Sequence, residues 1–596
     1  MTETQLDPHD ARLATSATGL LRTLNEAEVL EAADVHVAQR LCTLAEEDDA
    51  LVVLAVACVV RGMRGGSVCV DLGALVADPT LAELPWPDVE QWYAAVAASP
   101  LLTGPTPVLR MLDRLLYLDR YWREEEQVRD DLVARPAAEE PVDETWLEAA
   151  LERVFPREGY AEQRAAARVA LTHRTSVLTG GPGTGKTTAV AGLLALLAER
   201  AEAPLRIALA APTGKAAARL QEAVEREVAG LGADDQQRLA GLRAVTLHRL
   251  LGPRPDTSSR FRHHRDNRLP HDVVVVDETS MVSLTMMARL LEAVRPDARL
   301  VLVGDPDQLA SVEAGAVLAD LVAGFEESAD SPVAALRRTH RFGARIGALA
   351  DALRTGDADA ALAELRAGST EVELVDAGDE AAVTRFREQV TDVAAELRRA
   401  GEAGDREAAL QALAGHRLLC AHREGPFGVT GWNRLVERLV AERTGVTHYD
   451  EWYAGRPILV TANDYDQLLN NGDMGATVRD AEGRLRVVVQ LGGTTRELAT
   501  SRLAGVETVH AMTVHKSQGS QARVVSVVLP DEQSRLLTRE LFYTAVTRAQ
   551  ERVRVVGTEA GIRAAIGREV QRASGLRGRL RQALARTPPP GVTLRE

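Results

Sequence analysis

The pattern that most constrains this chain is a glycine-rich loop between an apolar run and a predicted helix. Gly180 and the tripeptide Gly185-Lys186-Thr187 are separated by four residues, after the apolar run 176–178 and before a helix expected from Thr188. Backbone amides of such a loop, together with the N-terminus of the helix, bind phosphate groups. The pattern therefore predicts a phosphate-binding loop at the edge of a parallel α/β sheet.

From residue 175 onward, short apolar runs alternate with helical stretches. The runs are 176–178, 206–210, 273–276, 300–303, 418–421, 458–461, 524–529 and 553–556. This alternation is typical of parallel sheets covered by helices. Between 472 and 509, the runs 476–479 and 485–491 lie among glycine-rich turns and predict a small inserted β module.

The N-terminal part of the chain is expected to form a mostly helical domain. Apolar residues recur at helical spacing in 24–45, 87–98 and 108–132, and a Pro-rich, acidic linker follows at 134–144. The first 150 residues contain 28 acidic and 11 basic side chains and so carry a charge of −17, whereas the remainder carries +1. Such a segment repels a phosphate backbone and is better suited to a protein partner, whereas the near-neutral remainder could hold a basic groove.

Only three lysines occur in the chain, against 67 arginines. A compact ammonium fits where a planar guanidinium cannot, so these lysines should mark positions that need a point charge. They are Lys186 in GGPGTGKTT, Lys215 in APTGKAAARL and Lys516 in TVHKSQGS. The first context predicts a nucleotide site, and the other two predict contacts with nucleic acid.

The cellular compartment is indicated by what the composition lacks. The four cysteines show no metal-ligand spacing and are expected to be free thiols in a reducing environment. The first fifteen residues do not resemble a signal peptide, and the longest apolar run, 51–60, is too short to cross a bilayer. We therefore expect a cytoplasmic protein.

Three further polar positions complete a site for ATP and Mg²⁺. Asp277 and Glu278 follow the run 273–276, where the carboxyl end of a parallel strand faces a ligand crevice. Thr187 and Asp277 would bind Mg²⁺, Glu278 would accept a proton from the attacking water, and Lys186 would reach the terminal phosphates. Gln308 in GDPDQ could sense the γ-phosphate, although these residues could also form a simple turn.

At this point several long motifs resemble one family, the superfamily 1B DNA helicases of the RecD type, alpha subunits of exodeoxyribonuclease V (RecBCD). The matching stretches run in the family's order from about residue 160 to 560. They are GGPGTGKTT, APTGKAAARL, TLHRLLG, VVVVDETSM, GDPDQL, RRTHRFG, LLCAHREGPFGVTGWN, GRPILVTANDYDQLLNNGDMG, AMTVHKSQGS and ELFYTAVTRAQ. Weaker similarity to the amino-terminal region of the family covers much of the remainder.

The resemblance implies two RecA-like motor domains that enclose ATP. Its implied organisation is a partner-docking domain (1–133), a linker (134–145), motor domain 1 (146–345, small insertion 252–271), motor domain 2 (346–575, SH3-like insertion 472–509) and a basic tail (576–596). Gln163 would read adenine, and Arg341 and Arg548 would be arginine fingers that stabilise charge on the transferred phosphoryl group. The remaining implied nucleotide contacts are Gly181, Pro182, Gly183, Thr184, Gly185, Thr188 and Gly519.

The resemblance also implies a track for single-stranded DNA across both motor domains. Its expected residues are Pro212, Thr213, Lys215, Arg219, Thr246, His248, Thr513, His515 and Lys516. Hydroxyls, lysines and amides suit sequence-independent contact with the DNA backbone. The basic segment 259–268 could be a strand-separating pin or a solvated loop. Gln521 replaces a glutamate that is usual in the family.

The implied function is that of a 5′→3′ ATP-dependent DNA helicase in a heterotrimer with a RecB-like nuclease-helicase and a RecC-like scaffold. A nuclease centre of the PD-(D/E)xK type needs an acid two residues before a lysine, and Thr184, Thr213 and Val514 stand there instead. Nuclease activity is therefore expected on a partner chain. A stand-alone helicase of the same superfamily and an ATP-gated DNA-binding scaffold remain as alternatives.

Overall fold

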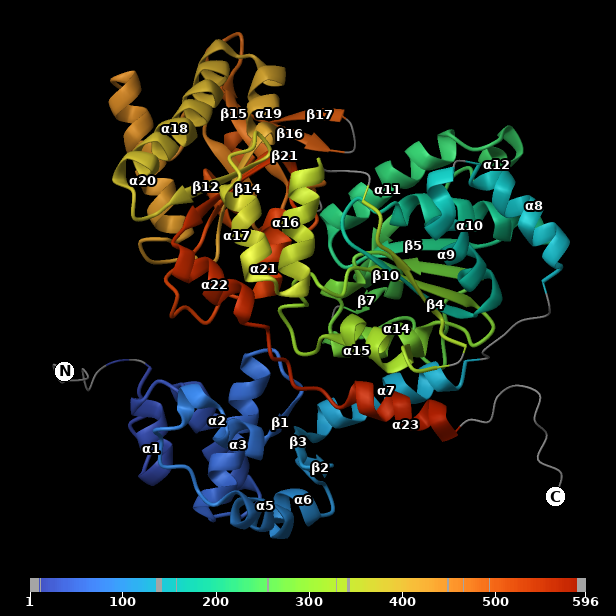
Figure 1. The fold of residues 1–596 in the computed structure, drawn as a ribbon, viewed down its shortest axis with the longest axis vertical. Coiled ribbons are helices and arrows are strands. Elements are labelled where there is room, and N and C mark those ends of the chain that lie inside the picture. The colour runs from blue at the N-terminus through green and yellow to red at the C-terminus, as the bar shows by residue number, and fades with distance from the viewer. Residues whose placement is uncertain are drawn as a thin grey trace.

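A computed structural model shows how these segments are arranged (Figure 1). It describes residues 10, 12–135, 142–156, 158–254, 257–328, 330–339, 343–446, 450–464, 466–491 and 494–586. Two parallel sheets with helices on their faces lie side by side, and a helical domain lies below them in the figure. The predicted α/β class with a mostly helical N-terminal domain is confirmed.

The N-terminal domain consists of helices around a small antiparallel sheet. Its main helices are α1 (Gly19–Glu26), α2 (Ala32–Leu44), α3 (Ala50–Arg64), α4 (Leu72–Val76), α5 (Val89–Ala98), α6 (Pro100–Thr103) and α7 (Asp119–Val133). Its sheet has the order β1 (Cys69–Asp71), β3 (Leu115–Leu118), β2 (Leu109–Leu112). The buried residues of α3 form the centre of this domain's core.

The prediction of one helix over 108–132 was wrong in its first half. Strands β2 and β3 form a hairpin there, and only the second half is helix α7. Asp113 and Arg114 in the turn have φ angles of 48° and 67°, the left-handed conformation that a two-residue hairpin requires. The apolar residues on both sides fit a strand period as well as a helical one, so periodicity did not separate the two.

Motor domain 1 is built on a six-stranded parallel sheet in the order β11-β4-β10-β9-β5-β6. The strands are β4 (Thr175–Gly180), β5 (Ile207–Ala211), β6 (Ala244–Thr246), β9 (Val273–Val276), β10 (Arg299–Gly304) and β11 (Val333–Leu336). The covering helices are α8 (Glu144–Val154), α9 (Ala161–Thr172), α10 (Lys186–Arg200), α11 (Gly214–Ala229), α12 (Ala233–Arg238), α13 (Leu247–Leu251), α14 (Leu284–Ala293) and α15 (Val317–Phe325). The basic segment 259–268 begins in a separate hairpin of β7 (Pro253–Arg254) and β8 (Thr257–Phe261).

Motor domain 2 has a five-stranded parallel sheet in the order β12-β21-β20-β13-β19. The strands are β12 (Val372–Asp376), β13 (His416–Cys420), β19 (Ala511–Thr513), β20 (Ala522–Val528) and β21 (Ala549–Gly557). The helices are α16 (Ala344–Thr355), α17 (Ala358–Arg366), α18 (Glu380–Ala403), α19 (Arg406–Gly415), α20 (Val429–Thr444), α21 (Arg539–Val546) and α22 (Glu559–Gly567).

A second five-stranded sheet, entirely antiparallel, is attached to motor domain 2. Its order is β17 (Thr494–Ala499), β16 (Leu485–Leu491), β15 (Met474–Arg479), β14 (Pro457–Val460), β18 (Val506–Thr508). The run 458–461 was wrongly expected in a parallel sheet, because a short, fully apolar run does not reveal the direction of its partners. The likeness of this sheet to an SH3 fold stays a prediction.

The last described helix, α23 (Leu576–Arg586), returns to the opposite side of the molecule (Figure 1). It packs between α7 and α15, and Leu576 and Leu580 are fully buried there. The guanidinium of Arg579 lies over the rings of Tyr117 and Trp122, 5.2 and 5.3 Å from their centroids. The C-terminal helix thus belongs to a core that the N-terminal domain shares with motor domain 1.

Candidate active site

The glycine-rich loop joins β4 to α10, as predicted. Gly183 and Gly185 both have φ angles of 85°, a backbone conformation that favours glycine. The Lys186 Nζ donates hydrogen bonds to the carbonyl oxygens of Gly180 and Gly181. The ammonium is therefore held over the loop whose backbone would wrap a phosphate chain.

A cavity of about 520 Å³ opens beside this loop, between the two motor domains. It brings together twelve of the residues predicted for the nucleotide: Gln163, Pro182, Gly183, Gly185, Lys186, Thr187, Thr188, Asp277, Glu278, Gln308, Gly519 and Arg548. Gly181 and Thr184 lie in the same loop, where the Thr184 hydroxyl donates to the Gly181 carbonyl over 2.9 Å. Arg341 lies outside the described residues.

Gln163 is held against the phosphate-binding loop by one end of its side-chain amide. Its Nε2 donates to the Thr184 carbonyl over 2.8 Å, and the side chain is buried. Its Oε1 is buried without a hydrogen-bond partner among the residues that the structure describes. A buried acceptor of this kind is costly unless a ligand donates to it, so the cavity fits a nucleotide base.

The two carboxylates after β9 face the same cavity. Glu278 has a φ angle of 51°, which is rare for a residue other than glycine and indicates strain at this position. Burial and the neighbouring charge of Glu278 raise the pKa of Asp277, whereas the charge of Lys186 opposes that rise. Asp277 and Thr187 line the same cavity, and their carboxylate and hydroxyl groups are the hard oxygen ligands that Mg²⁺ prefers, so the residues present fit the cation.

Arg548 comes from motor domain 2 and is only 3% exposed. Its guanidinium donates to the Thr544 carbonyl over 3.2 Å, to the Ser520 carbonyl and to the side-chain oxygen of Gln308. These acceptors are all neutral, and burial lowers the pKa of the guanidinium. A buried cation without an anionic partner in a nucleotide cavity is suited to bind a phosphate oxygen.

Two residues that the sequence analysis missed connect the motor domains. The Tyr543 hydroxyl on α21 donates to Asp305 Oδ2 over 3.1 Å, and Gln308 Nε2 donates to the same oxygen over 2.9 Å. Since Gln308 also accepts from Arg548, a continuous chain of hydrogen bonds crosses the cleft. Asp305 was treated only as part of a turn; its place in the GDPDQ stretch beside Gln308 was the available signal.

The residues predicted for DNA occupy several distinct places. The Thr213 side chain caps the N-terminus of α11, and the Thr246 side chain caps that of α13. Pro212 directly precedes Thr213. His248 is exposed and contacts Phe261 edge-on, with ring centroids 5.6 Å apart. Together these side chains lie along the N-terminal ends of two helices of motor domain 1.

Lys215 bridges motor domain 1 and the antiparallel sheet. Its Nζ donates to the Gly472 carbonyl over 3.3 Å, and burial, followed by the charges of Arg417 and Arg219, lowers its pKa to about 7. On motor domain 2, Thr513 and Lys516 line a separate cleft of about 400 Å³ with three arginines: Arg423, Arg434 and Arg456. Burial lowers the pKa of the neighbouring His515.

Arg219 does not share a cleft with these residues. It lines the nucleotide cavity instead, as does Gln521, which accepts a hydrogen bond from Gln550 over 3.2 Å. The substitution of Gln521 for the usual glutamate therefore alters the charge of the nucleotide cavity.

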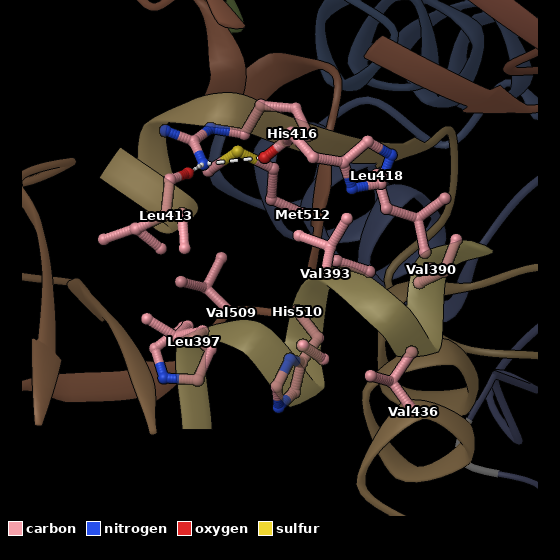
Figure 2. Close-up of a pocket in the computed structure, with 15 residues that line it drawn as sticks. Val390, Val393, Leu397, Leu413, His416, Leu418, Val436, Val509, His510 and Met512 are labelled. Atoms are coloured by element: carbon pink, nitrogen blue, oxygen red, sulfur yellow. Dashed lines mark hydrogen bonds between the residues drawn. The ribbon is translucent and has the colours of Figure 1, made fainter. Parts of the chain in front are cut away.

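Figure 2 shows a different cavity, of about 40 Å³, inside motor domain 2. It is lined mainly by apolar side chains such as Val390, Leu397 and Met512, and it has room for only a few water molecules. Burial lowers the pKa of His416 to about 3 and that of His510 to about 4, so both histidines are neutral near pH 7. This cavity is part of the core rather than a ligand site.

None of the described helices is long and apolar enough to cross a membrane. Within the described residues, no group of three or more His, Cys, Asp or Glu side chains could hold a metal ion, and the four cysteines are buried free thiols.

Three family models match the chain. They are an AAA domain over residues 163–314, a UvrD-like helicase C-terminal domain over 508–556, and the N-terminal domain of RecBCD enzyme subunit RecD over 26–117. Among similar proteins, a RecBCD enzyme subunit RecD of Mycolicibacterium smegmatis is 63% identical over 94% of this chain and 98% of its own length. The corresponding subunit of Mycobacterium tuberculosis is 58% identical over 96% and 98%.

A more distant relative is the ATP-dependent RecD2 DNA helicase of Deinococcus radiodurans. It is 34% identical over 76% of this chain and 57% of its own length.

The Gly185→Ala substitution should abolish measurable ATP binding. Alanine is strained at a φ of 85°, and its Cβ would lie 2.6 Å from Gln163 Nε2. Gly241→Ala is a matched control, because Gly241 has a φ of 82° and open space around its Cβ position. Both variants should lose at least about 1 kcal/mol of stability, the first more than the second because of its contact with Gln163, but only the first should lose binding of a fluorescent ATP analogue. Equal affinity in the two variants would contradict the assignment of this loop.

The buried His416 should make stability fall in mild acid. Its folded-state pKa of about 3 lies below the ordinary 6.5, so the unfolded chain binds the proton more readily below pH 6.5. Stability is then lost progressively as pH falls from 6.5 towards 3, by about 1.4 kcal/mol for each pH unit. The free energy of unfolding, measured with denaturant between pH 7.5 and 5.5, should fall less steeply with pH in His416→Gln than in the wild-type chain, because the contribution of His416 is removed. Ser526→Ala, which removes only the hydroxyl 2.9 Å from His416 Nε2, should keep the wild-type slope.

Proposed function

The chain belongs to the RecD family of RecBCD enzyme subunits, and we propose that it translocates 5′→3′ on single-stranded DNA as the ATP-driven helicase subunit of such a complex. The observation that carries the proposal is the buried Arg548 of motor domain 2, which meets the phosphate-binding loop of motor domain 1 in one cavity. If hydrolysis needs groups from two domains, its rate depends on how closely those domains approach each other. A motor requires such a link between hydrolysis and domain movement.

The residues that line the cavity support the following roles in ATP hydrolysis. Lys186 and the loop amides bind the phosphates, and Thr187 with Asp277 would hold Mg²⁺, which when bound neutralises charge on the phosphate oxygens. Glu278 accepts a proton from the water that attacks the γ-phosphate. Arg548 stabilises the charge that spreads over the transferred group, and Arg341 would be the second finger by resemblance.

Movement along DNA would follow from the connection between the two motor domains. When Arg548 turns from Gln308 to a phosphate oxygen, the chain through Gln308, Asp305 and Tyr543 must rearrange. The predicted DNA residues lie on both motor domains, with Lys215 on the first and Lys516 on the second. A change in the distance between the domains would therefore move one set of DNA contacts relative to the other.

The acidic N-terminal domain supports a role within a larger assembly. Its negative charge disfavours DNA, so we assign it to docking on a partner protein. RecB-like nuclease-helicase and RecC-like scaffold chains would complete a heterotrimer that processes double-strand DNA ends for recombinational repair. Chromosomal DNA as the substrate would place the protein in the cytoplasm.

The direction of movement can be tested on duplexes that carry either a 5′ or a 3′ single-stranded tail. We expect the purified chain to unwind only the 5′-tailed duplex in the presence of ATP and Mg²⁺. DNA-stimulated ATP hydrolysis without unwinding would mean that the motor needs its partner chains. Preference for the 3′ tail would contradict the proposed polarity, and DNA binding without any hydrolysis would favour a scaffold.

The assigned chemistry predicts different losses for two substitutions. Glu278→Gln should bind ATP normally but lower kcat by about 10²- to 10⁴-fold, because the proton acceptor is lost. Lys186→Ala should instead weaken ATP binding. Glu202→Gln, which removes one exposed carboxylate away from the cavity, is the control and should hydrolyse ATP at the wild-type rate. Hydrolysis by Glu278→Gln at the wild-type rate would refute the role of that carboxylate.

A further inference from the structure

One side of helix α11 forms a wall of the nucleotide cavity. The residues that line it are spaced at helical intervals: Ala216, Arg219, Leu220, Ala223, Arg226 and Glu227. The first turn of this wall lies against motor domain 2, because a Cβ on Gly519 would be 3.7 Å from the Ala216 backbone nitrogen. Arg219, one turn further along, is thus close to the end of the cavity where the two motor domains meet.

The guanidinium of Arg219 is half-buried and has neither a hydrogen bond nor an ion pair with any residue that the structure describes. Such isolation is uncommon here, since most arginines around the motor domains bind a carboxylate or a carbonyl, as Arg206 binds Asp272 over 2.7 Å. A half-buried guanidinium that lacks a protein partner is suited to an anionic ligand.

Its charge acts on the residues at the reacting end of the cavity. Burial is the largest cause of the lowered pKa of Arg548, and the positive charge of Arg219 lowers it further. Arg219 of motor domain 1 and Arg548 of motor domain 2 thus line the same cavity, beside the phosphate-binding loop, and are close enough for their charges to interact.

From this geometry we infer that Arg219 is a nucleotide-binding residue that contacts the terminal phosphate of ATP, rather than a DNA-binding residue. The inference rests on the proposed ATP-dependent function and adds a third arginine, supplied by motor domain 1 itself. A guanidinium at this place distinguishes a triphosphate from a diphosphate, because only the triphosphate extends to the end of the cavity where the domains meet.

The neighbouring Lys215 supports an anion at this position. It lies four residues before Arg219 on the same helix, a spacing at which like charges repel each other. Lys215 is directed to the Gly472 carbonyl of the antiparallel sheet, whereas Arg219 lines the nucleotide cavity. A phosphate next to Arg219 would relieve this repulsion, so ATP binding would also be felt at Lys215 in the predicted DNA track.

The test is equilibrium binding to the full-length chain, with fluorescent ATPγS and ADP in the absence of DNA, and with a labelled oligo(dT) in the absence of nucleotide. Arg219→Gln should weaken ATPγS binding by about 10- to 100-fold, the effect of losing a hydrogen bond from a charged group. Binding of ADP and of oligo(dT) should change by less than about 3-fold. Arg219→Lys should recover part of the ATPγS affinity, because it restores a positive charge.

The control is Arg200→Ala, which removes one exposed arginine from the far end of α10 and should change none of the three affinities. An equal loss of ATPγS and ADP binding, or weaker oligo(dT) binding with unchanged ATPγS binding, would overturn the inference. In both cases the wild-type chain still binds and hydrolyses ATP, so the proposed function stands. A wild-type chain that does not bind ATPγS would instead overturn the proposed function and this inference together.

Discussion

The hydrogen-bond chain from Tyr543 through Asp305 and Gln308 to Arg548 is the interaction on which the active site depends. It is buried, and it joins two domains that also meet at Leu309 of motor domain 1, which packs into the core of motor domain 2. A buried polar chain is stable only when every member keeps a partner, so no member can leave for a phosphate oxygen without a change in the others. The domain contact and the catalytic groups therefore cannot change independently.

Much of the fold and of the nucleotide site could be predicted from sequence, because residues close together in the sequence determine the local structure there. A strand, a glycine-rich loop and a helix fix Lys186 and Thr187 in one arrangement, and Asp277 follows a strand that is apolar throughout. Asp305 and Tyr543 could not be predicted as a pair, since they are 238 residues apart and meet only when the two domains pack. The hairpin at 109–118 was missed for a different reason: its apolar residues satisfy two periods, and only the left-handed turn at Asp113 decides between them.

Arg219 shows where a motif is less informative than a structure. Its stretch, APTGKAAARL, places Lys215 and Arg219 four residues apart, which suggests a common role for both. In the structure the two side chains are neighbours on one face of the helix, but Arg219 lines the nucleotide cavity whereas the Lys215 ammonium is directed to the Gly472 carbonyl. Residues that share one motif and one helix face can thus be directed to different surroundings.

The path of the C-terminal segment explains how an acidic domain can be part of a DNA motor. Val68 of the N-terminal domain donates to the Ala573 carbonyl over 2.9 Å, and Arg572 donates to carbonyls of residues 311–315 in motor domain 1. Glu125 accepts from the Ser574 hydroxyl over 2.8 Å and pairs with Arg579. Together with the core that α7, α15 and α23 share, these contacts hold the N-terminal domain against motor domain 1. The acidic domain is therefore joined, through the C-terminal helix, to the motor domain that contains the phosphate-binding loop.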